Sequence, residues 1–213
     1  NSENAVAVVL LTDTPGGLDI SMREIIKAML NSQVPVILYI PPGSRAASAG
    51  TFIAMASHVS AMAPTTSIGA ASPVGAQGGD IGGTLEKKVT NDAAEYIRGL
   101  AKLRGRNDEW AAEKAVRNAE SLDAEAALEQ NVIDFVSPDL DSLLETLDGR
   151  IIQLNETTSI KLNLKDAQVV YDDMSLIERI LFTISDPNLA FLLLSLGSLG
   201  IFFELSNPGT FFP

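Results

Sequence analysis

A serine among small residues is the feature of this sequence best suited to chemistry. Ser48 stands in the run Ala46-Ala47-Ser48-Ala49-Gly50, shortly after the turn residues 41–43. Small neighbours let a substrate carbonyl come within about 3 Å of a hydroxyl and of nearby backbone N–H groups. The pattern therefore predicts an exposed nucleophile between a strand and a helix. An ordinary helix N-cap is the alternative, because serine is favoured at that position.

A serine nucleophile needs a base that accepts its proton, and this chain offers few. Its one histidine, His58, follows Ser48 by ten residues. On a single helix the two would lie about 15 Å apart along the axis, so we predict a structural role for His58. The remaining base is a lysine that burial keeps partly unprotonated. Lys87 and Lys88 stand at a predicted helix start, which disfavours an ammonium; a solvated surface charge is the alternative.

Backbone N–H groups are the expected donors to an oxyanion, because the sequence shows no metal site. Gly16 and Gly17 lie in the turn after the first predicted strand. In a parallel sheet this loop can lie beside the loop that follows the second strand and carries Ser48. Gly17 and Ala49 are therefore the predicted donors, with Gly16 as the alternative glycine. No cofactor is expected.

Composition limits the classes of function. The 213 residues suffice for one sizeable domain, or for one domain with a small appendage, and 46% of them are hydrophobic. A net charge of −12 with no basic patch argues against a nucleic-acid partner. The lack of cysteine excludes a disulfide framework, a thiolate metal site and a cysteine nucleophile. Because the chain starts with asparagine, we expect that an N-terminal segment, such as a signal peptide, has been removed.

Aliphatic runs alternate with helical patterns up to residue 147, which predicts an α/β fold with a mostly parallel sheet. The first strand, residues 5–11, is continuously apolar and is expected to be buried on both faces. Further strands are expected at 34–40, 59–63 and 132–136, with another element beginning near 67, and helices at 20–30, 49–57, 85–104, 110–118 and 122–128. Five glycines between Gly75 and Gly83 predict a flexible loop, either a lid or a plain surface loop.

The chain changes character after residue 147. Short apolar runs at 151–154, 160–164 and 169–171 predict a small β module. An amphipathic helix is expected over 174–184. From Pro187 to Phe203 there are 17 residues without charge, at the lower limit of what spans a bilayer, so we expect the start of a membrane anchor, with a buried core helix as the alternative. The apolar end of the chain suggests that a longer protein was cut.

Several motifs in order resemble those of ClpP-class serine peptidases, most closely the membrane-bound NfeD type, the operon partners of stomatins. The resemblance rests on residues 13–17, 41–51, 63–70, 120–134 and 184–209. It implies a ClpP/crotonase-like core of repeated ββα and βαβ units and a Ser–Lys dyad. The family's serine falls on Ser48 and its lysine on Lys88, with Lys87 as the fallback. Its oxyanion glycine falls on Gly17 or Gly16.

The resemblance also implies a substrate and a location. We expect cleavage of hydrophobic segments of a stomatin/SPFH-family protein by a homodimer or larger oligomer, attached to a membrane with the peptidase domain outside the cytoplasm. The expected domains are 1–147 (peptidase), 148–173 (β module) and 174–213 (amphipathic helix and anchor). An idle scaffold in a membrane SPFH assembly is the alternative function. A crotonase-like acyl-CoA enzyme is a third interpretation, for which no basic or adenine-binding feature is present.

Overall fold

The computed structural model describes residues 5–75, 79, 81–165, 167–184 and 187–206. The chain divides into two compact units, residues 1–167 and 168–213. Compact units need not coincide with domains, so the boundaries expected near residues 147 and 173 stay predictions. The elements of the first unit are β1 (Val8–Leu11), α1 (Asp19–Leu30), β2 (Val36–Ile40), β3 (Arg45–Ala47), α2 (Ala49–Ala56), β4 (Val59–Met62), β5 (Ser67–Gly69), α3 (Gly83–Leu103), the π-helix η1 (Trp110–Arg117), β6 (Ser121–Asp123), α4 (Ala124–Glu129), β7 (Phe135–Val136), α5 (Leu140–Leu147), β8 (Ile151–Gln153) and β9 (Ser159–Lys161).

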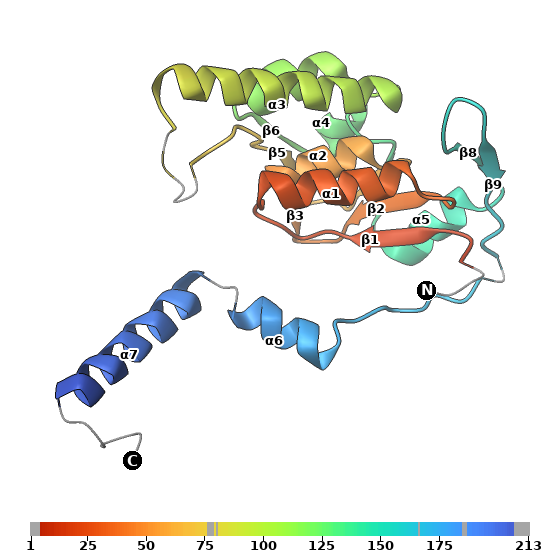
Figure 1. Ribbon diagram of the computed structural model, residues 1–213. Coiled ribbons are helices and arrows are strands. Elements are labelled where there is room, and N and C mark those ends of the chain that lie inside the picture. The colour runs from red at the N-terminus through yellow and green to blue at the C-terminus, as the bar shows by residue number, and fades with distance from the viewer. Residues whose placement is uncertain (1–4, 76–78, 80, 166, 185–186, 207–213) are drawn as a thin grey trace. The chain divides into compact units, whose positions relative to one another are not determined.

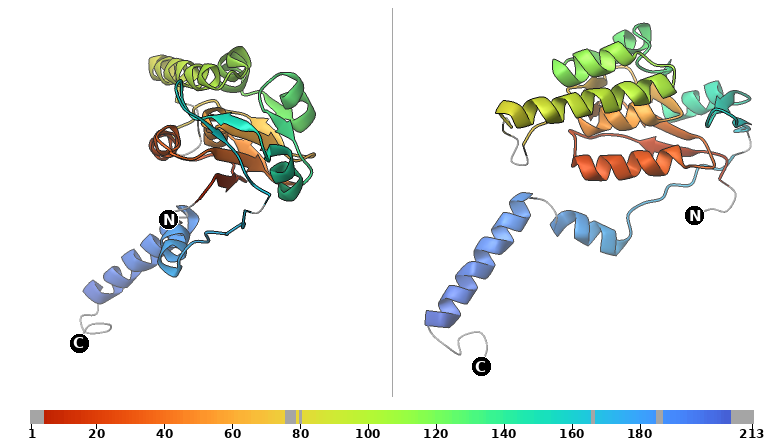
Figure 2. Two further views of the ribbon diagram at one scale, coloured as in Figure 1. Left: turned by 90° about the vertical axis from the view of Figure 1, so that its right-hand side faces the viewer. Right: turned by 45° about the horizontal axis from the view of Figure 1, so that its top comes forward.

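A parallel sheet forms the centre of the first unit. Its strands lie in the order β1-β2-β4-β7, as the predicted mostly parallel α/β fold requires. Alternate residues of β2 enter different cores, because successive side chains of a strand point to opposite faces. Leu38 packs with α1, α2 and α3, whereas Ile37 and Tyr39 pack with α5. The views in Figures 1 and 2 show these helices on the two sides of the sheet.

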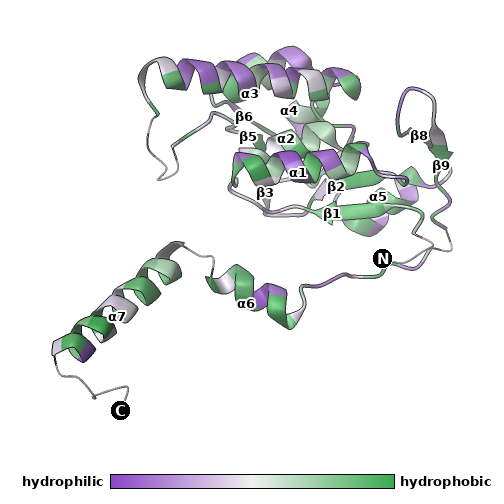
Figure 3. Cartoon of the chain, viewed as in Figure 1, coloured by the Kyte–Doolittle hydropathy of each residue, from purple (hydrophilic) through white to green (hydrophobic). Residues whose placement is uncertain are grey.

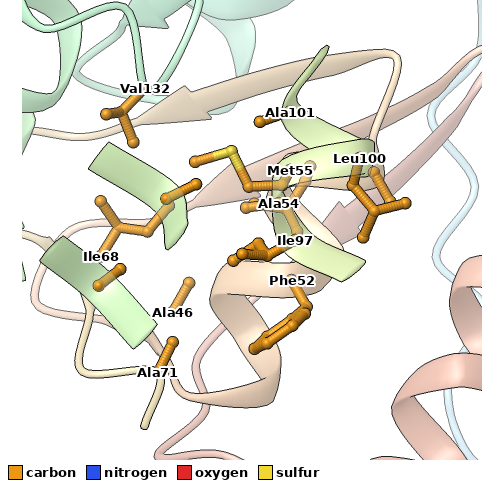
Figure 4. Packing of buried hydrophobic residues seen from close by; sticks show 14 of the residues in the cluster. Ala46, Phe52, Ala54, Met55, Ile68, Ala71, Ile97, Leu100, Ala101 and Val132 are labelled. Atoms are coloured by element: carbon orange, nitrogen blue, oxygen red, sulfur yellow. The ribbon is translucent and has the colours of Figure 1, made fainter. Parts of the chain in front are cut away.

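The helix after Ser48 is the buried centre of the larger core. α2 is almost entirely apolar, and Phe52, Ala54 and Met55 are each at most 5% exposed. Figure 4 shows these side chains between Ile68 on β5 and the inner face of α3, represented by Ile97. The segment around Ser48 between β3 and α2, called the serine turn below, therefore leads into a helix whose residues are almost all buried.

A second sheet joins the segments around Ser48. β3 pairs in parallel with β5, and β5 pairs antiparallel with β6. The sequence did not predict β3, because Arg45 to Ala47 follow two prolines and a glycine after a single serine. The short β3 strand nevertheless forms, since its neighbours in space supply the hydrogen-bond partners.

Several sequence predictions need correction. β1 is not buried on both faces: Val8 is 40% and Leu11 48% exposed, because β1 is the outermost strand of its sheet. α5 was not predicted, although Asp139 caps it by accepting the Ser142 N–H at 2.7 Å. The expected helix at 110–118 is a π-helix. The last strand, expected over residues 132–136, contains only Phe135 and Val136 of β7. Of the predicted glycine-rich loop, residues 76–78 and 80 lie outside the described residues.

The β module contains fewer strands than predicted. β8 and β9 form an antiparallel hairpin, and Ile152 and Leu162 pack into the core beside α5. Residues 169–171 do not form the expected strand, and within the described part of the chain they pair with no other segment. Their side chains are exposed, so no packing compensates the entropy of ordering a strand there.

The described residues of the second unit form two helices, α6 (Leu176–Ile184) and α7 (Pro187–Ser206). Figure 3 shows α7 as apolar over most of its length. The window Leu189–Ser206 has a mean hydropathy of 1.9 and is long enough to cross a membrane. None of that window is buried within the described structure. A membrane anchor and a helix packed in a core both remain compatible with this length and composition.

Candidate active site

Ser48 adopts a strained backbone conformation at the start of α2. Its φ is 54° and its ψ is −116°, a region that residues with a Cβ rarely occupy and that costs about 1–3 kcal/mol. Its side chain makes no capping hydrogen bond to α2, which excludes the ordinary N-cap interpretation in this conformation. Its own N–H donates to the Gly69 carbonyl at 3.0 Å. A strained serine between a strand and a helix is how a nucleophile is presented in the strand–turn–helix elbow of many hydrolases.

The loop after β1 is bonded directly to the serine turn. Thr14 bridges to Ala46 of β3: the Thr14 N–H donates to the Arg45 carbonyl at 2.8 Å, and the Ala47 N–H donates to the Thr14 carbonyl at 3.0 Å. The bridge brings Gly16 against Ser48. A Cβ at Gly16 would lie 2.8 Å from the Ser48 Cβ. The predicted meeting of the two loops is therefore present.

The side chain of Thr51 stabilises the same turn through hydrogen bonds. Its hydroxyl is fully buried and lies 2.9 Å from the Ala46 carbonyl oxygen and 2.8 Å from that of Gly69. It also accepts the Gly69 N–H at 3.1 Å. One side chain thus ties α2 to both β3 and β5, on either side of Ser48. Sequence patterns assigned no role to Thr51 or Gly69, because their partners are brought close only by strand pairing.

The predicted oxyanion donors lie on either side of the serine. Ala49 is the first residue of α2, so its N–H points out of the helix end and has no intrahelical acceptor. Gly17 is exposed and follows Gly16 in the bridged loop. Neither N–H donates a hydrogen bond to another described residue. The Gly16 N–H is already committed, since it donates to the Thr14 hydroxyl at 3.1 Å. This favours Gly17 over Gly16 as the donor.

The two candidate lysines lie in the first turns of α3, and both are exposed. The burial expected for the base is therefore absent. Within the described residues neither lysine forms a hydrogen bond or ion pair, and Ser48 Oγ makes no hydrogen bond either. The structure thus brings Gly16 against Ser48, next to Ala49 and Gly17 in the chain, and among the described residues it brings no base into contact with Ser48.

The faces of α3 distinguish the two lysines. Lys88 precedes Asp92 by one turn and shares its face, and Asp92 pairs with Arg23 of α1 at 2.5 Å. α1 begins directly after the Gly16–Gly17 loop. Lys87 instead shares a face with Asn91, which accepts a hydrogen bond from Arg117 of η1 at 2.6 Å. Lys88 therefore lies on the face of α3 that pairs with α1, and Lys87 on the face that contacts η1.

His58 has a structural role, as predicted. Its Nδ1 accepts the Val36 N–H at 3.0 Å, so it joins β2 to the start of β4. Burial, reinforced by the neighbouring Arg104 guanidinium, lowers the pKa of His58 to about 4. The ring is therefore neutral near pH 7, and it is absent from the serine turn at the other end of α2.

Comparison with known proteins places the chain in a family. The family model described as the NfeD1b N-terminal domain matches residues 1–172. The chain belongs to this family. The NfeD resemblance of its motifs is thereby confirmed.

Two curated proteins are similar over nearly the whole chain. The membrane-bound protease PH1510 of Pyrococcus horikoshii is 39% identical over 217 residues, which cover 99% of this chain and 48% of that protein. The membrane protein NfeD1b of Bacillus subtilis is 27% identical over 207 residues, which cover 97% of this chain and 45% of that protein. The chain thus spans about half the length of these relatives.

Solved structures share the fold. A lysine-to-alanine variant of the 1510-N membrane-bound stomatin-specific protease, in complex with a substrate peptide, has a TM-score of 0.77 at 36% identity, over 86% of this chain and 85% of that chain. A serine-to-alanine variant of the same protease has a TM-score of 0.73 at 38% identity, over 81% and 84% of the two chains. The α/β fold of this NfeD-family chain is therefore that of the 1510-N protease.

Proposed function

We propose that this chain carries the catalytic domain of a membrane-attached serine endopeptidase that cleaves hydrophobic peptide segments. The observation that carries the proposal is the serine turn: Ser48 is strained, does not cap α2 and lies against Gly16. The names of the relatives support the same activity, since one is a membrane-bound protease and another a stomatin-specific protease solved with a substrate peptide.

In the proposed reaction, Ser48 Oγ attacks the peptide carbonyl while a lysine accepts the hydroxyl proton. The N–H groups of Gly17 and Ala49 donate to the oxyanion that develops on the carbonyl oxygen. The lysine then gives the proton to the leaving amine, and water attacks the acyl-enzyme ester with the same base. Preorganised donors of this kind are typically worth about 10²–10³ in kcat each.

Lys88 is the proposed base, because its face of α3 pairs with α1, the helix that follows the Gly16–Gly17 loop in the chain. The solved relatives include a serine-to-alanine and a lysine-to-alanine variant, as expected for a protease whose dyad was being disabled. Since Lys88 is exposed in the single chain, we propose that bound substrate or a second copy covers it and removes the water around its ammonium group.

The natural substrate is proposed to be a hydrophobic segment of a stomatin/SPFH-family membrane protein, after the stomatin-specific relative. α7 is proposed to attach the chain to the same membrane. Assembly as a homodimer or larger oligomer, with the peptidase domain outside the cytoplasm, completes the proposal.

The decisive experiment compares the parent chain with its Ser48→Ala, Lys88→Ala and Lys87→Ala variants on a hydrophobic stomatin-like peptide between about pH 6 and 10. We expect Ser48→Ala and Lys88→Ala each to reduce kcat by about 10²–10⁴-fold. Lys87→Ala, the matched control one residue away, should retain kcat within about threefold. The parent rate should rise with pH, because the base acts only when unprotonated.

Activity that survives Ser48→Ala would rule out this mechanism. Loss of activity in Lys87→Ala but not in Lys88→Ala would move the base by one residue and leave the serine in place.

A catalytically idle scaffold is the second candidate, favoured by one observation: no base contacts Ser48 among the described residues. A fluorophosphonate reagent separates the two functions. An active dyad should label Ser48, with labelling lost in Lys88→Ala, whereas a scaffold should remain unlabelled while still binding its SPFH partner.

A further inference from the structure

A cavity of about 580 Å³ lies in the first unit at the end of the sheet opposite the serine turn. His58 and Phe135 in its wall mark the beginnings of β4 and β7, whereas Ser48 follows the carboxyl end of β2. The β8–β9 hairpin supplies another side of the wall through residues 151–156. The volume lies within the range of about 300–1,000 Å³ that is common for small-molecule sites.

The cavity wall contains a half-buried arginine with no anionic partner among the described residues. Arg104 donates from Nε to the Ala56 carbonyl at 2.9 Å and from Nη1 to the Leu154 carbonyl at 3.1 Å. Its Nη2 is buried. Among the described residues, this atom has no hydrogen-bond partner and forms no ion pair with a carboxylate. Burial and the nearby Arg106 lower the pKa of Arg104 to about 10, so the guanidinium remains a cation near pH 7. A desolvated cation without an anion is unfavourable.

A second arginine stands at the cavity mouth. The Arg150 guanidinium lies 4.8 Å from the centre of the Phe135 ring, and its Nε donates to the Thr146 carbonyl at 2.8 Å. Within the described residues it has no ion pair. Its exposed side chain can therefore turn a free edge of the guanidinium toward a ligand.

A neutral donor lies beside the two cations. Because His58 Nδ1 accepts a hydrogen bond from the Val36 N–H, the proton of the neutral ring is on Nε2. The nearby Leu154 carbonyl raises the pKa of His58 against the larger effect of burial. Nevertheless, Nε2 has no hydrogen bond of normal geometry to any described residue. His58 Nε2 and Arg104 Nη2 are thus two donors beside the cavity that are shielded from solvent and have no acceptor of normal geometry among the described residues.

Among the described residues, the carboxylates in the wall form no ion pair with these arginines, and the charge of Asp134 only partly offsets the effect of burial on Arg104. Asp134 is occupied, since it pairs with Arg106 at 2.6 Å and accepts the Ser60 N–H at 2.7 Å. Glu156 remains at the exposed rim. Apolar surface completes the wall through Val59, Leu103, Phe135 and Ile151. In a chain of net charge −12, this wall combines unpaired cations with apolar surface.

We propose that this cavity binds a monocarboxylate with an apolar body. Arg104 and Arg150 hold the carboxylate, and Phe135 and Ile151 contact the apolar part. A free carboxylic acid and the C-terminus of an apolar peptide share this chemistry. The proposal does not depend on the peptidase mechanism, because the site shares no residue with the serine turn.

Isothermal titration calorimetry on the full chain in detergent tests the site, with hexanoate and the uncharged hexanamide as matched probes. Hexanoate should bind at least about tenfold more tightly than hexanamide, and Arg150→Gln should weaken hexanoate binding about tenfold or more. Arg150→Lys keeps the charge and should retain most of the affinity. Arg117→Gln, which removes an arginine from η1, and Ser48→Ala should leave binding unchanged.

Equal binding of hexanoate and hexanamide, or an Arg150→Gln variant that binds as the parent does, would overturn the proposal. Arg104→Gln is a supporting variant, read only where its circular dichroism matches the parent, because Arg104 also contacts α2. A short apolar peptide with a free C-terminus and its amidated form identify the source. Binding of the free form more tightly than hexanoate indicates a peptide terminus, and weaker binding indicates a free acid.

Discussion

Two neighbouring glycines tolerate a side chain very differently. Gly16 has a φ of +135°, and a Cβ there would meet Ser48 Cβ at 2.8 Å and Oγ at 3.1 Å. At Gly17, φ is ordinary and a Cβ would meet nothing within 4 Å. Gly16 is therefore required by the close approach of its loop to Ser48, whereas residue 17 has room for a side chain and needs only its N–H for the proposed oxyanion role.

This difference gives a matched pair of variants. Gly16→Ala should reduce peptidase kcat by about 10²-fold, because a shift of about 1 Å at Ser48 is costly to catalysis. Gly17→Ala retains its N–H and should stay within about threefold of the parent. Steady-state kinetics on the hydrophobic peptide measure both. Equal loss in the two variants would show that the Ser48 contact is not the reason for a glycine at residue 16.

His58 should make stability depend on pH. Its pKa falls from 6.5 to about 4 on folding, chiefly through burial, so between these values the unfolded chain binds a proton that the folded chain does not. The free energy of unfolding should therefore decrease as pH falls from 6.5 to 4, by about 1–2 kcal/mol after allowance for partial exposure. Urea unfolding followed by circular dichroism measures this loss.

His58→Asn is the control for that titration, because its amide oxygen can still accept the Val36 N–H while carrying no titratable group. The variant should lose less stability over the same pH range than the parent. Identical pH dependence in the two proteins would assign the effect to carboxylates instead.

At the scale of elements, Arg106 binds most of the carbonyls at the C-terminal end of α2, beside the Arg104 contact with Ala56. Arg106 Nη1 lies 2.7–3.1 Å from the carbonyl oxygens of Ala54, Met55 and Ser57, and its Nη2 pairs with Asp134. The side chain is 1% exposed. A cation at this end also interacts favourably with the negative end of the α2 dipole, and Ser48 lies at the other end of the same helix.

Arg106→Met should lower the free energy of unfolding by about 3–5 kcal/mol, since it leaves the Asp134 charge without its cation and the Ala54, Met55 and Ser57 carbonyls without the Arg106 donor. Lys114→Met, which removes a surface pair with Glu120 at 3.2 Å, should cost less than about 1 kcal/mol. Chemical denaturation of the two variants provides the comparison. Similar values would mean that water replaces Arg106 at the helix end.

At the scale of the whole molecule, α7 is expected to attach the chain to membranes. Replacing Leu194 and Leu196 by arginine should largely abolish flotation with liposomes, because a charge near the bilayer centre costs about 2.5–3.5 kcal/mol. Leu205→Arg lies at the end of the helix, where the long side chain can reach the interface, and should still float. Unchanged flotation of the double variant would exclude α7 as the anchor.

The first unit places different chemistry at the two ends of one helix. The N-terminal end of α2 carries Ser48 and the Ala49 N–H, and its C-terminal carbonyls are held by Arg104 and Arg106 next to the carboxylate cavity. Ligand binding at the cavity and peptide cleavage at Ser48 can therefore be measured separately on the same chain.

Local pattern in the sequence was sufficient for the serine turn, the parallel α/β core, most helices and the uncharged C-terminal segment. Each depends on neighbours in the chain: prolines and glycines that end a strand, apolar spacing, and a run without charge. The structural role of His58 followed from the same reasoning, because a short helix separates it from Ser48.

Tertiary structure alone decided which glycine touches Ser48, which hydroxyl stabilises its turn and which helix packs against the face of α3 that carries Lys88. These depend on contacts such as Thr14 with Ala46 and Ser48 with Gly69, between segments that only the order and register of the strands bring together. The same cause explains the errors, since the exposed edge of β1 and the pairing of β3 follow from neighbours in the sheet and not from their own residues.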